Sequence, residues 1–390
     1  MPRKLRLARP DAMVATHPLW QAHHDDLTAL AARGRIRALL PRRGRDFASN
    51  DYLALSGAGR LREAIGAALA RGVPAGSGGS RLLRGNDPEH EALEAEAAAW
   101  AGSETALFVS SGYAANVALL ATLPQTGDVI VHDDLIHASM HEGLRLSRAA
   151  ALPVPHNDAD TFAATCAQWR AAGHTGRIWL AFETLYSMDG DCAPLSDLAA
   201  IAERYDAVML IDEAHATGVF GHDGRGLAHG LDGRADTVVL RTCGKALGVE
   251  GALVCGPAVM RDFLVNRARP FIFSTAPSPL MAAAVREAIR ICVDEPQRRA
   301  ALAALSAHAA RLLTPLGARD TGTQILPLIL GDDARCMRVA GAVQAAGFDV
   351  RGIRPPTVAP GTARLRVSIT LNTTPADLDA LATTLQDSLT

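Results

Sequence analysis

The chain has 390 residues, of which 48% are hydrophobic and 21% charged, an ordinary composition for a globular protein with a sizeable core. Its net charge of −2 gives no bulk electrostatic reason to expect binding to nucleic acid or to a membrane surface. The six cysteines are scattered without metal-ligand spacing, which predicts free thiols. The sequence shows neither a secretory leader pattern nor an apolar run near ~20 residues, so we predict a cytoplasmic protein.

The first hundred residues predict helices separated by a polar loop. Residues 1–50 are expected to form an N-terminal helical segment. Residues 75–87 are too rich in glycine and serine to pack in a core, so they predict a loop with backbone freedom. The helical patterns cover residues 19–43, 61–71 and 88–101.

From residue 105 onward, short apolar runs alternate with helical stretches. This alternation is typical of βαβ units and predicts a mostly parallel sheet flanked by helices, within a large α/β domain at residues 51–275. The predicted strands are 106–109, 129–131, 178–182, 207–211, 238–240 and 252–255, and the predicted helices are 113–123, 160–172 and 195–204.

After Pro270 the pattern changes and predicts a smaller α+β C-terminal domain at residues 276–390. The predicted helices are 279–293, 296–314, 333–347 and 375–388, and the predicted strands are 324–330 and 364–371.

Lys245 follows the buried strand predicted at residues 238–240. A desolvated lysine loses proton affinity and becomes an amine nucleophile, so we expect Lys245 to form a Schiff base with a carbonyl cofactor. The alternative is a solvated loop lysine. A nucleotide phosphate loop is rejected, because Ala246 follows the lysine and the required upstream glycine is missing.

Polar groups follow five of the predicted strands, and ligands bind at the carboxyl ends of open parallel sheets. Ser110 and Ser111 open a helix, where they could cap it or mark a phosphate site. Asp212 ends an apolar run and needs a partner, which a cationic ring nitrogen would supply. The remaining polar groups after these strands are His132, Asp133, His137, Glu183, Ser187, Glu213, His215 and Thr242.

Two alternatives remain open for individual side chains. His137 could be a satisfied core histidine. A metal site at Asp212, Glu213 and His215 is disfavoured, because no second ligand cluster accompanies them. The combination of a Schiff-base lysine, a carboxylate for a pyridinium nitrogen and a phosphate-binding helix start is what pyridoxal 5'-phosphate requires.

The chain resembles the pyridoxal-phosphate α-oxoamine synthases of the fold-type-I aminotransferase superfamily, in family order from about residue 25. Within this family, residues 353–366 are similar to the biotin-pathway branch, the 8-amino-7-oxononanoate synthases. The matching stretches are residues 49–53, 76–81, 111–116, 136–139, 187–191, 212–215, 244–248 and 361–366.

This resemblance implies roles for individual residues. Lys245 would bind the cofactor and act as acid and base, with His137 stacked on the ring. Asp212 would pair with the ring nitrogen, and His215 would bond the ring oxygen. Further implied contacts are Gly112, Tyr113 and Thr242 to the phosphate, Ser187 to the cofactor, and Arg354 and Thr357 to the amino-acid substrate.

The resemblance also implies the reaction, a decarboxylative condensation of L-alanine with a pimeloyl thioester of CoA or acyl carrier protein. It implies a homodimer with the site between subunits, where Ser274 and Thr275 would reach the partner's phosphate. Alternatives are a relative that uses glycine or serine, and a catalytically silent binding module.

The chain departs from the family pattern in a few places. Ala216 replaces a usual glycine, and Arg241 and Cys243 flank Thr242. Cys243 is either an active-site thiol or a small filler. Leu40 falls near the position where relatives carry a substrate-binding arginine after the first helix, and Arg37 and Arg42 are the candidates to substitute for it.

Overall fold

The computed structural model describes residues 17–389, and the chain divides into two units at Arg43 and Gly44. In the first unit, a short 3-10 helix η1 (Pro18–Trp20) leads into α1 (Gln21–Ala32). Helix α1 is followed by Gly34, whose φ of +64° is a left-handed conformation that ends helices. The helix predicted at residues 19–43 is therefore wrong beyond its first half, because residues 35–43 form no helix.

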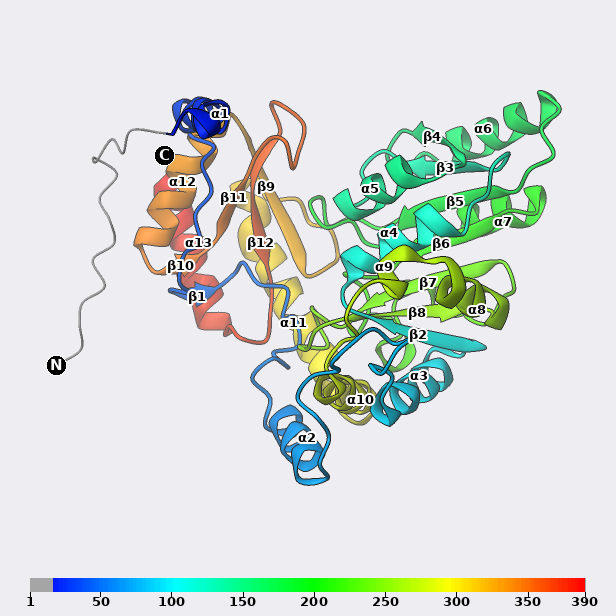
Figure 1. Ribbon diagram of the computed structural model, residues 1–390. Helices are drawn as coiled ribbons and strands as arrows, with labels where there is room; N and C mark the ends of the chain where they lie inside the picture. Colours follow the sequence, from blue (N-terminus) through cyan, green and yellow to red (C-terminus); the bar gives the residue numbers. More distant parts are fainter. Residues whose placement is uncertain (1–16, 390) are drawn as a thin grey trace. The chain divides into compact units, whose positions relative to one another are not determined.

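The second unit contains a seven-stranded sheet with the order β2-β8-β7-β6-β5-β3-β4 (Figure 1). Strands β3 to β7 pair in parallel, and β8 runs antiparallel to both of its neighbours. This topology confirms the predicted α/β class with a mostly parallel sheet. The strands are β2 (Thr105–Val109), β3 (Val129–Asp133), β4 (Ala150–Val154), β5 (Ile178–Glu183), β6 (Val208–Asp212), β7 (Thr237–Thr242) and β8 (Ala252–Gly256).

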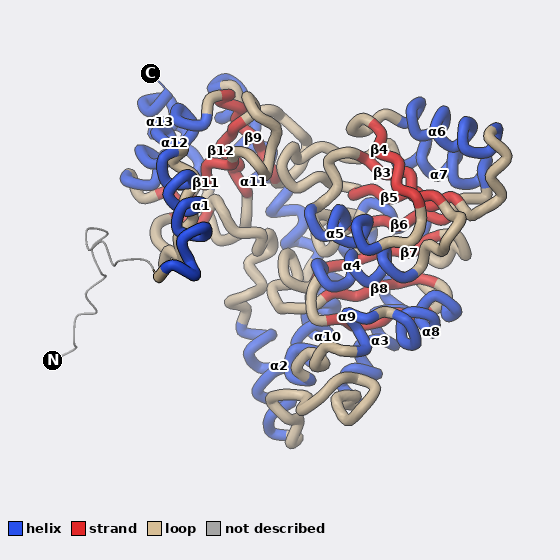
Figure 2. The backbone as a smooth tube through the Cα atoms, turned by 45° about the horizontal axis from the view of Figure 1, so that its top comes forward, coloured by secondary structure: helices blue, strands red, loops and turns tan. Residues whose placement is uncertain are grey.

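Helices cover both faces of this sheet, and buried side chains alternate between two apolar layers. Figure 2 shows α4 and α5 on one side of the sheet and α6 and α7 on the other. Trp179 and Leu210 pack in the layer that includes α4 and α5, whereas Leu180 and Ile211 pack in the layer with α6 and α7. The helices are α2 (Gly59–Ala70), α3 (Pro88–Ala101), α4 (Gly112–Thr122), α5 (Ala138–Leu146), α6 (Ala159–Ala171), α7 (Leu195–Tyr205), α8 (Ala258–Arg267), α9 (Arg269–Ile272) and α10 (Pro279–Asp294).

A second, antiparallel sheet lies further along the same unit, with the order β11-β12-β9. A short parallel pair joins β1 (Arg45–Asp46) to β10 (Phe348–Asp349). The remaining elements are α11 (Pro296–Leu313), β9 (Ile325–Gly331), α12 (Asp333–Ala345), β11 (Arg351–Ile353), β12 (Ala363–Ser368), α13 (Pro375–Leu389), and the 3-10 helices η2 (His222–Gly224), η3 (Leu227–Leu231) and η4 (Thr314–Leu316).

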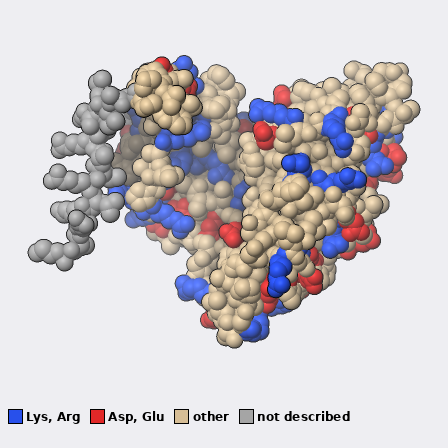
Figure 3. Space-filling view, viewed as in Figure 1, with Lys and Arg blue, Asp and Glu red and all other residues tan. Residues whose placement is uncertain are grey.

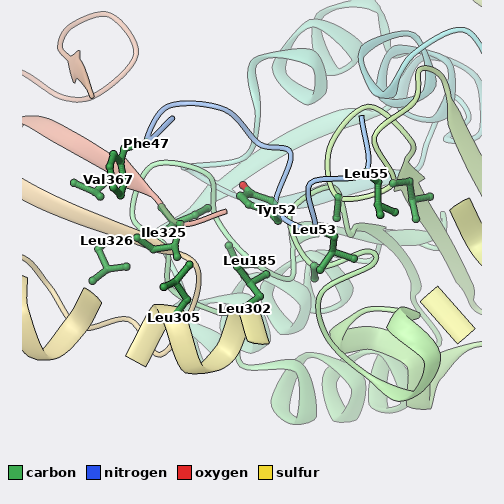
Figure 4. Packing of buried hydrophobic residues seen from close by; sticks show 14 of the residues in the cluster. Phe47, Tyr52, Leu53, Leu55, Leu185, Leu302, Leu305, Ile325, Leu326 and Val367 are labelled. Carbon is green, nitrogen blue, oxygen red and sulfur yellow. The ribbon is translucent and has the colours of Figure 1, made fainter. Parts of the chain in front are cut away.

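One apolar cluster links side chains around both sheets. Figure 4 shows Phe47 beside Val367 of β12, and Leu302 of α11 beside Leu185, which follows β5. The segment around Phe47 is tied to β12 by its backbone as well, because the Ser368 N–H donates to the Phe47 carbonyl at 3.0 Å. This cluster fixes the C-terminal sheet against the turn that follows β5.

Basic and acidic side chains are interspersed on the face of the second unit that Figure 3 shows. Among the described helices, residues 17–389, none is long and apolar enough to cross a bilayer.

Candidate active site

Three strand ends bring polar side chains to one face of the large sheet. Side chains alternate along a strand, so Glu183, Asp212 and Thr242 point to the same face as Trp179 and Leu210, the face that carries α4 and α5. Glu183 of β5 and Asp212 of β6 are register partners. The pairing of these strands thus brings together polar side chains whose convergence the sequence predicts from their positions at strand ends.

Asp212 is 3% exposed and is held by N–H donors rather than by a cation. Its Oδ2 accepts from Asn116 Nδ2 at 2.7 Å, and its Oδ1 accepts from the Ala214 N–H at 2.7 Å. Asn116 also donates to Ser139 Oγ at 3.0 Å. These donors fix the orientation of the carboxyl group, which suits Asp212 to hold a cationic ring nitrogen.

His137 is the N-cap of α5 and lies close to Asp212. Its Nδ1 shares a 2.7 Å hydrogen bond with Ser139 Oγ. Burial lowers the pKa of His137, although the charge of Asp212 opposes this shift. His137 therefore presents a neutral imidazole, a flat group able to stack on a ring.

Lys245 makes a direct hydrogen bond to His215, with 2.7 Å between Nζ and Nε2. Burial lowers the pKa of Lys245 to about 8, while the charge of Asp212 opposes that shift. Burial and the charge of Lys245 lower the pKa of His215 well below its ordinary value. Lys245 therefore has an accessible neutral form near physiological pH, as a nucleophilic amine needs.

Tyr52 continues this line of hydrogen bonds, with 2.6 Å between its hydroxyl and His215 Nδ1. The hydroxyl donates to Asn50 Oδ1 at 3.1 Å and accepts from Arg366 Nη2 at 3.3 Å. A protonated Lys245 donates to His215 Nε2, so the neutral imidazole carries its proton on Nδ1 and donates it to Tyr52. These contacts assign one tautomer to His215.

Tyr52 and Arg366 were not among the predicted site residues. Arg366 is 7% exposed, and its Nε donates to the Ser187 carbonyl at 2.6 Å. Its Nη2 donates to Asn50 Oδ1 at 3.0 Å. A sequence signal existed, since two arginines alternate with apolar residues in β12, but the contacts depend on pairing between distant segments.

The start of α4 and the end of β7 approach each other closely. A Cβ added at Gly112 would lie 3.4 Å from Thr242 Oγ1, so glycine leaves room for a ligand there. Ser111 caps α4 by accepting from the Ala114 N–H at 3.1 Å, which supports the capping interpretation of that serine. The free N–H groups of the first turn, at Gly112 and Tyr113, form a site suited to phosphate.

The other predicted residues lie in loops. Ser187 is half-buried and joins the cluster through its carbonyl, which accepts from Arg366. Arg354, half-buried, and Thr357, exposed, follow β11, and the Thr357 N–H donates to the Arg354 carbonyl at 3.1 Å. Their roles stay predictions, as do those of the half-buried Ser274 and the exposed Thr275 after α9.

Arg37 and Arg42 belong to the unit that ends at Arg43, and both are exposed. The part proposed for either of them in substrate binding therefore stays a prediction.

The departures beside Thr242 have structural explanations. Cys243 is fully buried and burial raises the pKa of its thiol, so it fills space rather than reacting. Arg241 is also fully buried, pairs with Asp232, and lies with its guanidinium 5.6 Å from the Trp100 ring.

Glu213 points away from the site. Its two carboxylate oxygens accept from the N–H groups of Leu227 and Ala228, at 3.0 and 2.7 Å. Asp212, Glu213 and His215 therefore do not converge on one point. Within residues 17–389, no group of three or more His, Cys, Asp or Glu side chains is placed to bind a metal ion.

Comparisons with known proteins agree with this geometry. The chain is 41% identical over 383 residues to the 8-amino-7-oxononanoate synthase of Anaeromyxobacter dehalogenans, covering 93% of this chain and 95% of that one. It is 42% identical over 349 residues to the synthase of the same name from Burkholderia thailandensis, covering 87% of both chains.

Solved structures also match over most of the chain. The 8-amino-7-oxononanoate synthase of Francisella tularensis is 26% identical with a TM-score of 0.75, covering 89% of this chain and 98% of that one. The serine palmitoyltransferase of Sphingomonas wittichii is 26% identical with a TM-score of 0.86, covering 95% and 97%. The family description "Aminotransferase class I and II" matches residues 44–385, and the chain belongs to this family.

Proposed function

We propose that this protein is a pyridoxal 5'-phosphate-dependent 8-amino-7-oxononanoate synthase. It condenses L-alanine with a pimeloyl thioester, carried by CoA or acyl carrier protein, and releases carbon dioxide. The observation that carries the proposal is the coincidence of the Lys245–His215–Asp212 cluster with relatives of this name at 41% and 42% identity.

The residues present fit pyridoxal phosphate. Lys245 supplies an amine with a pKa near 8 for the carbonyl carbon, Asp212 a fixed carboxylate for the ring nitrogen, and His137 a neutral ring for stacking. The α4 start at Gly112 and the Thr242 hydroxyl suit the phosphate. When bound, this cofactor withdraws electrons from the amino-acid Cα and so makes its proton removable.

The protein's own side chains then perform the proton transfers. Lys245 in its neutral form takes the proton from Cα of L-alanine, and later returns a proton to the product. His215 accepts a hydrogen bond from the protonated Lys245, and Tyr52 holds His215 in the accepting tautomer. When Lys245 is protonated, His215 is thus already in place to accept its hydrogen bond.

The substrate carboxylate needs a cation, and the chain offers two. Arg354, with Thr357 beside it, is the arginine proposed from the family resemblance. Arg366 lies in the hydrogen-bonded cluster through Tyr52 and Ser187, so it is the second candidate. Measuring KM for L-alanine in Arg354→Ala and Arg366→Ala distinguishes the two candidates, because loss of the arginine that binds the carboxylate raises KM more.

The proposed homodimer has support in an exposed apolar surface. Leu82, Leu83 and Phe273 are 49%, 81% and 70% exposed. Their two segments lie together, because the Ala276 N–H donates to the Gly79 carbonyl at 2.9 Å. Ser274 and Thr275 lie in one of these segments, as their proposed reach to the partner's phosphate requires.

The domain and location proposals rest on separate observations. We keep a domain division near residue 275, since the seven-stranded sheet ends at Gly256 and the antiparallel sheet begins at Ile325. The N-terminal segment is proposed for residues 1–50. All six cysteines are unpaired, and a reducing compartment such as the cytoplasm would keep them so.

Steady-state assays test the substrate assignment. Wild-type protein is expected to turn over L-alanine with pimeloyl-CoA or pimeloyl-acyl carrier protein, and Lys245→Ala is expected to lose both this activity and the visible absorption of the bound cofactor. Absence of turnover with L-alanine on either carrier would contradict the biotin-pathway assignment.

A related synthase that uses glycine or serine is the second candidate, favoured by the TM-score of 0.86 to a serine palmitoyltransferase. The same assay with glycine and serine and several acyl-CoA esters distinguishes it. A catalytically silent binding module is disfavoured by the intact Lys245–His215 contact, and it would bind ligand without turnover of any amino acid.

A further inference from the structure

A second carboxyl group lies beside Asp212 and has no role in the proposed chemistry. Glu183 ends β5, is 2% exposed, and is the register partner of Asp212 on β6. Both side chains point to the α4 and α5 face of the sheet, because apolar residues one position earlier on each strand pack in the opposite layer. Two buried carboxyl groups therefore share one edge of the pocket.

Their surroundings differ. Both oxygens of Asp212 accept strong hydrogen bonds, from Asn116 Nδ2 and the Ala214 N–H, each at 2.7 Å. Oε1 of Glu183 is buried and has no hydrogen-bond partner among the described residues. Ionising both groups would place two like charges together in a medium of low dielectric constant. Glu183 has fewer donors than Asp212, with the His137 backbone as its hydrogen-bond partner and Oε1 without one, so Glu183 is the group that keeps its proton.

The titratable groups facing Glu183 come from four neighbouring elements. They are Asp212 of β6, Lys245 after β7, Asp133 of β3, and Tyr186 in the turn after β5, with the His137 backbone at the start of α5. Burial raises the pKa of Glu183 well above its ordinary value, the charge of Asp212 adds to the shift, and Lys245 opposes it. The one cation in this set already bonds His215.

We propose that Glu183 is a positioning residue that stays protonated at neutral pH, so that the two paired carboxyl groups together carry no more than one negative charge. A single anion beside Lys245 favours the neutral amine more than two anions would, because a second negative charge would raise the pKa of the lysine further. The neutral Glu183 thus keeps the lysine reactive while it fills the pocket edge. This inference rests on the roles proposed for Lys245 and Asp212.

The composition of the chain makes the proposal directly measurable. Of its 39 lysines and arginines only Lys4 and Lys245 are lysines. Competitive acetylation of the cofactor-free protein over a pH series, read by mass spectrometry of the two lysine peptides, yields the pKa of Lys245 without any turnover. The readout is therefore independent of the proposed substrates.

Three variants give the decisive comparison. Glu183→Gln is expected to leave the pKa of Lys245 within about 0.3 unit of wild type, because it replaces one neutral group by another of the same shape. Asp212→Asn is expected to lower that pKa by about 1 unit or more, because it removes an anion. Glu203→Gln, at an exposed position of α7, is the matched control for a remote charge.

A Glu183→Gln shift as large as that of Asp212→Asn would overturn the proposal, because Glu183 would then be the ionised partner. A second measurement uses only the wild-type protein, so its result does not depend on whether a variant folds. The infrared spectrum of wild-type cofactor-free protein at pH 7 is expected to contain the carbonyl band of a protonated carboxyl group. Absence of this band would also overturn the proposal.

Discussion

Lys245, His215 and Tyr52 form a line of side chains in which each group determines the proton position of the next. The Lys245 ammonium group needs an acceptor, His215 supplies it through Nε2, and Tyr52 accepts from the opposite nitrogen. Asn50 accepts from the Tyr52 hydroxyl. The basicity of the lysine therefore depends on Tyr52, which is connected to Lys245 through His215.

Tyr52→Phe should test this dependence. The substitution leaves His215 Nδ1 without its partner, and a buried unpaired donor costs about 1–3 kcal/mol. We expect kcat/KM to fall by about tenfold or more, with the alkaline limb of the pH–rate profile displaced, since the His215 tautomer is no longer held. Tyr205→Phe, at the end of α7, serves as the control, and an unchanged kcat/KM in Tyr52→Phe would contradict the assigned tautomer.

His156 bridges two carboxylates, Asp133 of β3 and Asp191 of the turn that carries Ser187. Its Nδ1 lies 3.0 Å from Asp133 Oδ1, and its Nε2 lies 3.1 Å from Asp191 Oδ2. Burial alone would lower the pKa of His156, but hydrogen bonds to the two carboxylates outweigh it and raise the pKa to about 10. The folded protein therefore retains a proton that the unfolded chain releases near pH 6.5.

This raised pKa predicts a pH-dependent stability. The contribution of protonated His156 is fully present below about pH 6.5 and declines as pH rises toward 10, because the folded state binds the extra proton in that window. His156→Gln should lower the free energy of unfolding by about 3 kcal/mol at pH 6 and by much less at pH 10. Urea unfolding of both proteins across this range measures it, and a constant difference would refute the assignment.

Among the elements, the glycine-rich loop is joined to α3 by a buried ion pair. Arg81 and Glu94 of α3 have side chains only 7% and 8% exposed, and Arg81 Nη1 lies 2.8 Å from Glu94 Oε1. Glu94 also accepts from the Phe108 N–H of β2 at 2.9 Å. A loop with little apolar surface is thus connected to α3 and β2 through this ion pair, in addition to its hydrogen bonds to the segment after α9.

Arg81→Met should therefore destabilise the protein by about 3–5 kcal/mol, because it leaves the buried Glu94 carboxylate without its cation. Arg84→Met, at an exposed position of the same loop, is the matched control and should change stability by no more than about 0.5 kcal/mol. Denaturant unfolding measures both. Equal effects from the two variants would show that the ion pair does not hold the loop.

Sequence patterns predicted the central helices and strands well because each of these elements has a regular pattern of apolar residues along its whole length. Helix α3 lies at the predicted residues, and β5 is buried along its whole length, as its apolar run predicts. Strand β4 was missed, since its sequence Ala-Ala-Leu-Pro-Val forms a partly exposed edge and lacks an apolar run. The direction of β8 depends on the chain's route between strands, and periodicity does not encode that route.

The same limit applies to the site. Lys245, Asp212 and His215 follow strands, so their convergence could be predicted from the order of apolar runs. Tyr52 and Arg366 reach the same point from opposite ends of the chain, and their contact exists only through tertiary packing.

At the scale of the whole molecule, the exposed apolar surface around Leu83 predicts a quaternary structure. Leu83→Glu should convert a dimer into monomers and reduce activity with it, because charge at the centre of an apolar interface is costly to bury. Val259→Glu is the matched control, since Val259 is 76% exposed on α8. Sedimentation analysis of the three proteins measures the change, and a wild-type monomer would contradict the proposed homodimer.

The pairing of the start of the second unit with β12 has a consequence for synthesis. Asn50 and Arg366 share a hydrogen bond across 316 positions of the chain, and the Leu371 N–H donates to the Tyr52 carbonyl at 3.0 Å. The segment around Tyr52 is translated early, yet its partners emerge almost last. A nascent chain can complete the large sheet and expose Lys245 long before His215 acquires its fixed tautomer. Cofactor capture in the competent geometry must therefore wait until translation is nearly finished, and a product truncated before β12 would retain the lysine without the network that governs its proton.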